Sequence, residues 1–226
     1  MIENINFVIP EIFISLSLMF LLILGVFKKK SSSIIYNLSI VTLFILLTLI
    51  FTLPSNNIIK LFNNSFIIDP LSTYMKLILI FSGIFVMLTS SKYLKIIKIY
   101  KIEYPILILS SMLGMMVMIS SNDLIVFYMG LELQSLALYV LATYNRDQLK
   151  SSEAGLKYFV LSALSSGLLL YGCSLVYGFS GSTNFDVISN QLNSNEYVLT
   201  FGIVFILVGL AFKISAVPFH MWAPDV

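Results

Sequence analysis

Four ionisable side chains lie in or beside strongly apolar stretches, where charge is costly: Glu132, Lys157, Lys213 and His220. Moving a cation into hydrocarbon costs from ~2.5 to more than about 10 kcal/mol, so such groups face a protein interior or a wet cavity. A buried lysine also shifts its pKa readily, and it can then take up and release a proton. The chemistry that these residue types favour in such surroundings is proton transfer along an ion path.

Lys213 carries the clearest of these signals. It lies inside an apolar run, no carboxylate is near it in sequence, and Pro218 follows five residues later. Proline removes a backbone donor, and irregular backbone at membrane depth is tolerated only inside protein or around water. Broken helices recur at ion sites in transporters. We therefore expect a proline-broken helix with Lys213 and His220 at its joint. His220 suits a proton relay, and a structural hydrogen bond is the alternative.

Glu132 is the acid that matches these lysines. It lies near the centre of the apolar stretch 123–142, about 15 Å from either end at the rise of an α-helix. A lone carboxylate at that depth is neutral unless it meets a cation or water. Glu132 is then either a protonated structural residue that bonds a neighbouring helix, or half of a coupled acid–lysine pair. Such a pair would act as a proton switch.

Two further lysines have simpler interpretations. Lys157 follows Glu153 by four residues, the favourable order for an ion pair along a helix. It is either a paired lysine at the membrane interface or part of the ion path. Lys76 lies two turns into its expected helix, and we expect it to extend to the outer interface.

Small and amphipathic residues complete the set of candidates. Ser162, Ser165 and Ser166 predict close helix packing, with a file of ordered water beside Lys157 as the alternative. Cys173 stands alone, without the spacing of a disulfide or metal site, and we expect a small packing residue. Trp222 is expected to pack or to lie at the interface.

Composition defines the class of protein. Hydrophobic residues make up 58% of the chain and charged residues 11%, and the mean hydropathy is +0.97. Soluble chains carry roughly a quarter charged residues, so we predict an all-α polytopic membrane protein. One cysteine and one histidine cannot hold an iron–sulfur cluster or a bis-histidine haem. No glycine-rich nucleotide motif is present, so any redox chemistry belongs to partner proteins.

Apolar runs and breakers predict about seven membrane helices. Their expected positions are residues 7–27, 34–53, 70–89, 105–119, 123–142, 153–177 and 197 onward to an interruption near Pro218. Asp69 and Pro70 fit the N-cap and first turn of the third helix, and Asn122 or Asp123 caps the fifth. We divide the chain into residues 1–104, with three helices, and residues 105–226, with four.

The basic residues predict the orientation of these helices. Nine of them fall in three loops on one side of the membrane: Lys28, Lys29, Lys30, Lys92, Lys95, Lys98, Lys101, Arg146 and Lys150. The opposite loops hold Lys60 alone among basic residues. By the positive-inside rule these three loops face inward and the N-terminus faces outward.

Four runs together resemble a known family. They read LELQSL at 131–136, EAGLKYF at 153–159, SSGLLLYG at 165–172 and FKISAVPFHMWAPD at 212–225. They are similar to the antiporter-like subunit 2 (subunit N) family of NADH–ubiquinone oxidoreductase, respiratory complex I. The resemblance covers residues 105–226 and is weaker over the first three helices.

This resemblance implies a proton-translocating, non-redox subunit of the membrane arm. Glu132, Lys157 and Lys213 would form the acid–lysine series of its proton channel, with His220 at the helix break. NADH, FMN, iron–sulfur clusters and ubiquinone would bind partner subunits and not this chain. Its partners would be other membrane-arm subunits, including further antiporter-like ones, and no nucleic acid.

The family also has a second, inverted set of helices. The resemblance therefore implies that this chain is the N-terminal half of an inverted-repeat fold, as a fragment or a split-gene product. A separate chain would then supply the C-terminal half. The expected location is the mitochondrial inner membrane or, alternatively, a bacterial plasma membrane, with the N-terminus on the intermembrane-space or periplasmic side.

Two other functions remain compatible with the residues. A subunit of a cation/proton antiporter or membrane-bound hydrogenase would share the Glu132 and Lys213 pattern, and its partners would distinguish it. A structural or assembly subunit would keep the same ionisable residues without conducting protons.

Overall fold

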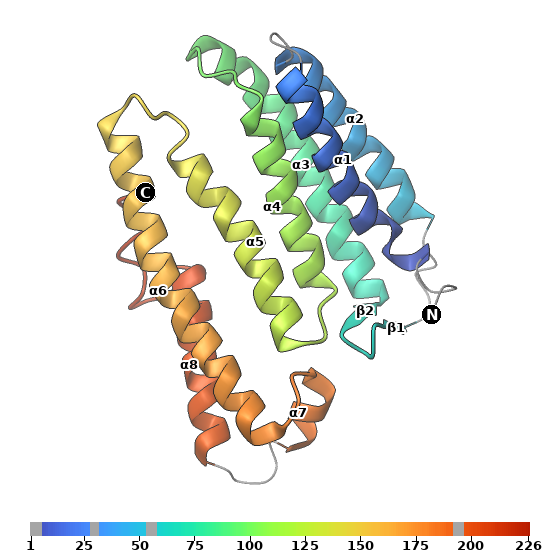
Figure 1. Ribbon diagram of the computed structural model, residues 1–226, viewed down its shortest axis with the longest axis vertical. Coiled ribbons are helices and arrows are strands. Elements are labelled where there is room, and N and C mark those ends of the chain that lie inside the picture. Colours follow the sequence, from blue (N-terminus) through green and yellow to red (C-terminus); the bar gives the residue numbers. More distant parts are fainter. Residues whose placement is uncertain (1–5, 28–31, 53–57, 192–196) are drawn as a thin grey trace.

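The computed structural model describes residues 6–27, 32–52, 58–191 and 197–226, and it is an array of antiparallel helices (Figure 1). The elements in chain order are α1 (Ile9–Phe27), α2 (Ser32–Phe51), β1 (Ile59–Leu61), β2 (Phe66–Ile68), α3 (Pro70–Ile96), α4 (Glu103–Ile119), α5 (Leu124–Ala142), α6 (Leu149–Ser180), α7 (Phe185–Gln191) and α8 (Tyr197–Lys213). Within this described part of the chain, α1, α2, α3, α5 and α6 are long and apolar enough to cross a membrane, and α4 and α8 are shorter apolar helices. The predicted all-α membrane fold is confirmed.

Two predicted helix starts are confirmed in detail. The Asp69 side chain accepts a hydrogen bond from the backbone of Ser72 at 2.7 Å, and the Ser72 hydroxyl accepts one from the backbone of Asp69 at 2.9 Å. At α5 it is Asp123 whose carboxylate accepts from the backbone of Ile125, at 2.8 Å. Each cap satisfies backbone N–H groups in the first turn that have no partner within the helix.

Several helices extend beyond their predicted ends. Helix α3 continues to Ile96, about two turns past the predicted end, so Lys92 and Lys95 belong to the helix rather than to a loop. A cation in the last turn interacts favourably with the helix dipole. Helix α6 likewise begins at Leu149, so Lys150 lies in its first turn.

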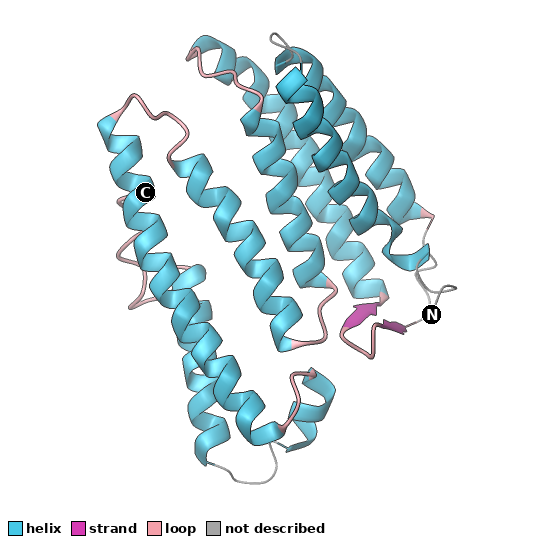
Figure 2. Cartoon of the chain, in the orientation of Figure 1, coloured by secondary structure: helices cyan, strands magenta, loops and turns pink. Residues whose placement is uncertain are grey.

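The two ends of the helix array differ in structure. The α3–α4 and α5–α6 loops lie at one end, and the β-hairpin, the α4–α5 turn and α7 lie at the other (Figure 2). The hairpin pairs Ile59 with Ile68 in antiparallel register. Neither it nor α7 was predicted. Lys28, Lys29 and Lys30 lie outside the described residues, and among the described loops the basic ones lie at the end opposite Lys60.

Polar contacts hold the hairpin end together. Lys60 forms an ion pair with Asp186 of α7 at 2.5 Å, and the amide of Asn122 donates to the carbonyl of Asn64 at 2.9 Å. The hydrogen bond from Lys60, followed by one from Asn122, lowers the pKa of Asp186 below its usual range. The Thr183 hydroxyl also donates to Asp123, the cap of α5. These contacts join the hairpin, the start of α5 and α7 into one layer.

Close packing between α6 and α8 depends on glycine. A Cβ placed on Gly172 would lie 2.8 Å from the backbone oxygen of Gly202, and one on Gly209 would lie 2.6 Å from Leu169. Small residues at such positions let membrane helices approach closely. Cys173 is buried in the same core, together with Leu169 and other apolar residues of α5, α6 and α8. The prediction of a packing cysteine is confirmed.

The expected helix break lies earlier than Pro218. Helix α8 ends at Lys213, Ser215 has a positive φ of 54°, and the chain continues as turns to Asp225. The backbone N–H of Ala216 reaches back to the carbonyl of Ala211 at 2.8 Å, which closes the helix end. The interruption is therefore a helix terminus, and the proline lies inside the turns that follow it.

The expectation that Lys76 extends to the interface is wrong. Its side chain is 1% exposed, and its ammonium forms an ion pair with Glu11 of α1 at 2.5 Å. The ammonium also lies 5.4 Å from the centre of the Phe66 ring. A lysine can be buried when a carboxylate compensates its charge. This partner lies 65 residues away in sequence, too far for the local pattern to reveal.

The predicted division between residues 1–104 and 105–226 stays a prediction. Helix α4 packs against α1 on one side and against α5 on the other. Gly114 of α4 and Gly130 of α5 face each other, since a Cβ on Gly114 would lie 2.7 Å from the Gly130 carbonyl oxygen. The two predicted parts therefore meet where α4 packs against α1, α2 and α3, and the α4–α5 contact lies within the second part.

Candidate functional site

Lys213 lies at the centre of a polar cluster formed by three helices. Its ammonium donates hydrogen bonds to the Ser135 hydroxyl at 3.0 Å, the Tyr139 hydroxyl at 2.9 Å and the Ser162 hydroxyl at 2.8 Å. Ser135 and Tyr139 come from α5 and Ser162 from α6. A lysine ammonium has three N–H donors, so these three neutral acceptors match its full capacity.

Glu132 is the fourth neighbour of Lys213 and the most distant. Its Oε1 lies 3.4 Å from the lysine Nζ, and the same oxygen accepts a hydrogen bond from the Ser166 hydroxyl. Charge-assisted hydrogen bonds between ammonium and carboxylate are usually about 2.7–2.9 Å long. The acid and the amine are thus in contact without being tightly bound, and their side chains are 20% and 10% exposed. Either group can change charge while the other keeps its hydroxyl partners.

The cluster lies at mid-membrane depth. Glu132 follows the cap of α5 by nine residues, about 13 Å along the helix axis. Lys213 ends α8, which Figure 1 shows stopping partway along α6. The end of α8 therefore places the Lys213 amine at the same depth as Glu132. The turns that follow α8 cover the first half of α6.

Of the four predicted site residues, Glu132 and Lys213 form a pair, and Lys157 and His220 lie apart from it. Glu132 and Lys213 meet, but Lys157 does not reach them. Its ammonium lies 2.8 Å from Glu153 and 3.3 Å from Asp225, and its side chain is 43% exposed. The ion pair with Glu153 was predicted from spacing, and the contact with Asp225 was not. An open cleft of about 630 Å³ beside them is lined by Lys157, Trp222 and Asp225 among others.

His220 lies in the turns after α8. Its side chain is exposed, and among the described residues its imidazole has no hydrogen-bond partner. Its backbone carbonyl accepts a bond from Ala223 at 3.1 Å. A relay role for His220 stays a prediction, since the structure does not bring its ring to Lys213.

The serines of α6 do more than pack helices. The Ser162 hydroxyl accepts a hydrogen bond from Lys213, and the Ser166 hydroxyl donates one to Glu132. Neither serine contacts Lys157, beside which ordered water was the alternative prediction for these serines. Ser165 donates to the backbone of its own helix at 3.1 Å. Their spacing of four residues places Ser162 and Ser166 on one helical face, toward the acid–lysine pair.

Tyr139 and Ser135 were missed from the sequence. Both lie on the face of α5 that carries Glu132, Ser135 three residues and Tyr139 seven residues further along. That spacing was the available signal. The spacing could not show that α8 packs nearby and places the Lys213 amine against the hydroxyl groups of that face.

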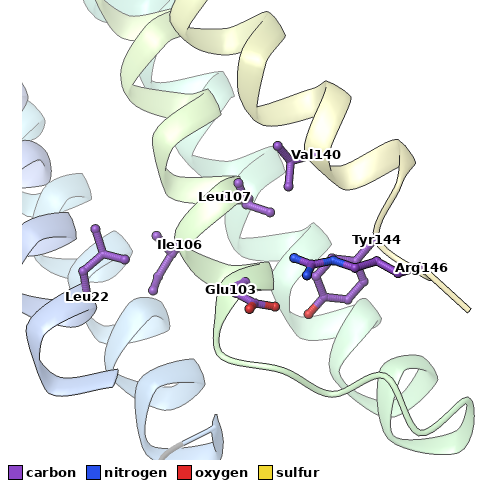
Figure 3. A pocket seen from close by; sticks show the side chains of 7 residues that line it. All are labelled: Leu22, Glu103, Ile106, Leu107, Val140, Tyr144 and Arg146. Atoms are coloured by element: carbon purple, nitrogen blue, oxygen red, sulfur yellow. The ribbon is translucent and has the colours of Figure 1, made fainter. Parts of the chain in front are cut away.

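A second pocket lies away from this cluster, between α1, α4 and α5. It has a volume of about 180 Å³ and is lined by Leu22, Glu103, Ile106, Leu107, Val140, Tyr144 and Arg146. Figure 3 shows Glu103, Tyr144 and Arg146 close together at one side, with aliphatic side chains on the other. Burial raises the pKa of Tyr144 to about 12, so its phenol stays neutral. We assign this pocket no chemistry.

Comparison with known proteins finds clear similarities to antiporter-like membrane subunits. The family model described as NADH:quinone oxidoreductase/Mrp antiporter, transmembrane, matches residues 121–226, which include the whole polar cluster. NADH-quinone oxidoreductase subunit N of Pelagibacter ubique is 72% identical over 224 residues, or 99% of this chain and 48% of that protein. The chain is thus similar over nearly its whole length to this antiporter-like subunit.

A second relative and two solved structures are also similar to the chain. Subunit N of Bartonella bacilliformis is 52% identical over 228 residues, covering 100% of this chain and 46% of that protein. Respiratory complex I from Thermus thermophilus, solved with bound aureothin, contains a chain with a TM-score of 0.78 and 25% identity, over 96% of this chain and 46% of that one. An archaeal membrane-bound sulfane sulfur reductase shares the fold, with a TM-score of 0.79 at 23% identity, over 96% of this chain and 46% of that one. The chain spans about half the length of the curated relatives it matches.

Proposed function

We propose that the chain is part of a proton-translocating membrane-arm subunit of NADH–quinone oxidoreductase. The observation that carries this proposal is the contact between Lys213 and Glu132 at mid-membrane depth, inside a cluster of four hydroxyl groups. An ionisable pair there is a functional-site candidate by default, because burying it has no structural benefit over apolar packing. The similarity to antiporter-like subunits supports the same role.

The geometry suggests how the pair exchanges protons. While Lys213 is charged, Glu132 is favoured as a carboxylate, and the pair is neutral overall. Loss of the lysine proton favours protonation of Glu132, so the charge states of the two groups change together. In our proposal, quinone reduction elsewhere in the assembly shifts this balance through a lateral row of acids and lysines. Lys157, in its exposed cleft, receives the proton from inner water.

Partners and cofactors follow from this assignment. Redox chemistry belongs to other subunits, which would bind NADH, FMN, iron–sulfur clusters and quinone. This chain would act as a non-redox subunit beside other membrane-arm subunits, further antiporter-like ones included. Its single cysteine and single histidine support that division of labour.

We further propose a bacterial plasma membrane as the location. The named relatives are bacterial, which favours one of the two membranes expected from the sequence over the mitochondrial inner membrane. The N-terminus and the β-hairpin would face the periplasm, because the described basic loops lie at the opposite end.

The direct test of this function is Glu132→Gln in the assembled complex. Glutamine keeps the size and a hydrogen-bond acceptor for Ser166 but cannot ionise. We expect a lower proton yield per NADH, measured as acidification coupled to NADH oxidation in membrane vesicles. NADH oxidation with an artificial electron acceptor should stay normal.

Glu103→Gln is the matched control, because Glu103 is an exposed glutamate at the unrelated pocket. It should leave the proton yield unchanged. An unchanged yield in Glu132→Gln as well would refute the role given to Glu132.

A cation/proton antiporter subunit is the second candidate. The description of the matched family also names Mrp antiporters, and such proteins could use the same pair. The partner set distinguishes the two functions. If the chain is part of NADH–quinone oxidoreductase, mass spectrometry should detect it in the NADH-dehydrogenase-active band of a native gel. Absence of the chain from that band would favour the antiporter.

A further inference from the structure

We propose that Tyr139 is a positioning residue of the Lys213–Glu132 site. Its phenolic oxygen stabilises the charged lysine independently of Glu132, and it links Lys213 to Ser162. This inference rests on the proposed function, because it concerns how the same site holds its proton.

The phenolic oxygen occupies a central place in the cluster. It accepts a hydrogen bond from Lys213 at 2.9 Å and donates one to the Ser162 hydroxyl. Ser162 also accepts from Lys213, at 2.8 Å. The three polar groups therefore form a closed ring of hydrogen bonds across α5, α6 and α8, and the whole ring is inaccessible or nearly so, since Tyr139 and Ser162 are buried.

Aromatic packing fixes the phenol in that place. The Tyr139 ring meets the ring of Tyr158 edge to face at 4.8 Å and that of Phe159 at 5.7 Å. Tyr158 stacks on Trp222 at 4.6 Å, and the Trp222 indole N–H donates to the carbonyl of Phe212 at 3.1 Å. Phe212 immediately precedes Lys213. The phenol is thus held by a column of rings anchored to the helix end that carries the amine.

The Ser135 hydroxyl on the amine is less free to respond than the phenol. Ser135 donates its proton to the Leu131 carbonyl of its own helix at 2.7 Å, and its role toward Lys213 is that of an acceptor. Tyr139 donates across to another helix. When Lys213 loses its proton, the neutral amine becomes an acceptor and the phenolic O–H can turn toward it. Tyr139 therefore has a partner in both charge states of the lysine.

This arrangement explains the loose contact with Glu132. With the phenol present, the ammonium has three neutral acceptors and does not need a short bond to the acid, which lies at 3.4 Å. Without the phenolic oxygen the ammonium loses one of them. The charged form is then less stable, and Lys213 holds its proton less tightly.

The titratable groups around the amine are few among the described residues. They are Glu132 and Tyr139 on α5, with Tyr128 beside Glu132, and Tyr158 on α6 against the ring of Tyr139. A phenol ordinarily ionises only near about pH 10, above the range of proton pumping. The pH dependence of the site is therefore that of the Lys213–Glu132 pair.

The test is Tyr139→Phe in the assembled complex, read as the pH dependence of proton yield per NADH. Phenylalanine keeps the ring packing and removes the oxygen. The alkaline limit of proton yield should move to lower pH by about one unit, the size of one hydrogen bond to a charged group. Assembly and NADH oxidation with an artificial acceptor should be unchanged.

Tyr158→Phe is the matched control. It makes the same change on the neighbouring ring, whose hydroxyl does not bind Lys213, and its pH profile should match that of the parent. A Tyr139→Phe profile that superimposes on that of Tyr158→Phe would overturn the inference. A uniform loss of yield without a shift would do the same, because it indicates packing alone.

A second variant keeps the inference testable if Tyr139→Phe fails to assemble. Ser162→Ala removes the acceptor of the phenolic proton and should shift the limit in the same direction, whereas no shift counts against the proposal. Failure of the function itself is distinguishable. If Glu132→Gln leaves the proton yield unchanged, the proposed function is wrong. If Glu132→Gln lowers the proton yield but Tyr139→Phe does not shift its alkaline limit, only the inference about Tyr139 is wrong.

Discussion

Two acid–lysine pairs among the described helices differ in separation, in burial and in hydrogen bonding. Glu11 and Lys76 are in contact at 2.5 Å and are almost completely buried, and Glu11 Oε2 has no hydrogen-bond partner among the described residues. Glu132 and Lys213 lie 3.4 Å apart and are surrounded by hydroxyl groups. Protonating Glu11 would leave the Lys76 charge uncompensated in an apolar core. The first pair is therefore a fixed structural contact and the second an exchangeable one.

The Glu11–Lys76 contact predicts a specific pattern of stability. Glu11→Leu alone leaves a buried, unpaired lysine and should destabilise the fold by about 3–5 kcal/mol, or roughly 10 °C in melting temperature for a chain of this size. The double variant Glu11→Leu with Lys76→Met replaces both charges with apolar groups and should recover most of that loss. Thermal unfolding in detergent, followed by helical circular dichroism, measures both.

Equal losses in the single and double variants would show that the side chains matter for packing rather than for charge. Lys76→Met alone serves as the reciprocal control, because it leaves the carboxylate unpaired.

Single residues were predictable where an ionisable side chain interrupts an apolar run. Glu132 and Lys213 stand out in that way, and the structure brings them together. The partners were less predictable, because Lys76 meets Glu11 and Lys157 meets Asp225 across long separations in sequence. A local pattern marks a costly charge, but only the packing of distant helices shows what compensates it.

At the scale of elements, the glycine contacts between α6 and α8 determine where Lys213 lies. Gly172 lies against the backbone of Gly202 and Ile206, with 2.8 Å from its ideal Cβ position to each. From this close contact α8 runs antiparallel to α6 until Lys213 meets Ser162. Any widening near Gly172 would draw the amine away from its hydroxyl partners.

Gly172→Ala should therefore separate the two helices and destabilise the core by about 1–3 kcal/mol, the usual cost of overpacking. Cys173, the single cysteine, is buried beside it, so maleimide labelling of its thiol should become faster. Gly167→Ala is the matched control on the same helix, because a Cβ there meets nothing within 4 Å. That change should be neutral or stabilising by up to about 1 kcal/mol through helix propensity.

Comparable labelling rates in the two alanine variants would contradict the packing account of this interface.

Helix starts were predictable and several helix ends were not. Asp69 and Asp123 cap their helices through local hydrogen bonds that the sequence alone implies. Helix α8 ends at Lys213 rather than at Pro218, because the turn at Ser215 is stabilised by packing of Trp222 against α6. The hairpin is short and depends on contacts with the α4–α5 turn, so its own residues carry little signal.

At the scale of the whole molecule, the polar groups are divided between the two ends and one central site. The hairpin end is joined by Lys60, Asp186 and their neighbours, and the opposite end carries the described basic loops. Between them, Glu132 and Lys213 lie where the turns after α8 replace a full-length helix. In the proposed mechanism, protons crossing this part of the molecule exchange with that pair.

The proposed function requires that Lys213 releases and rebinds a proton during turnover. Lys213→Arg tests it most directly in the assembled complex, because arginine keeps the positive charge and its hydrogen bonds but does not deprotonate in proteins. Lys150→Arg, on an exposed lysine in the first turn of α6, controls for the substitution itself. We predict normal assembly, normal NADH oxidation with an artificial acceptor, and a reduced proton yield per NADH in Lys213→Arg alone. A proton yield equal to that of Lys150→Arg would contradict the account.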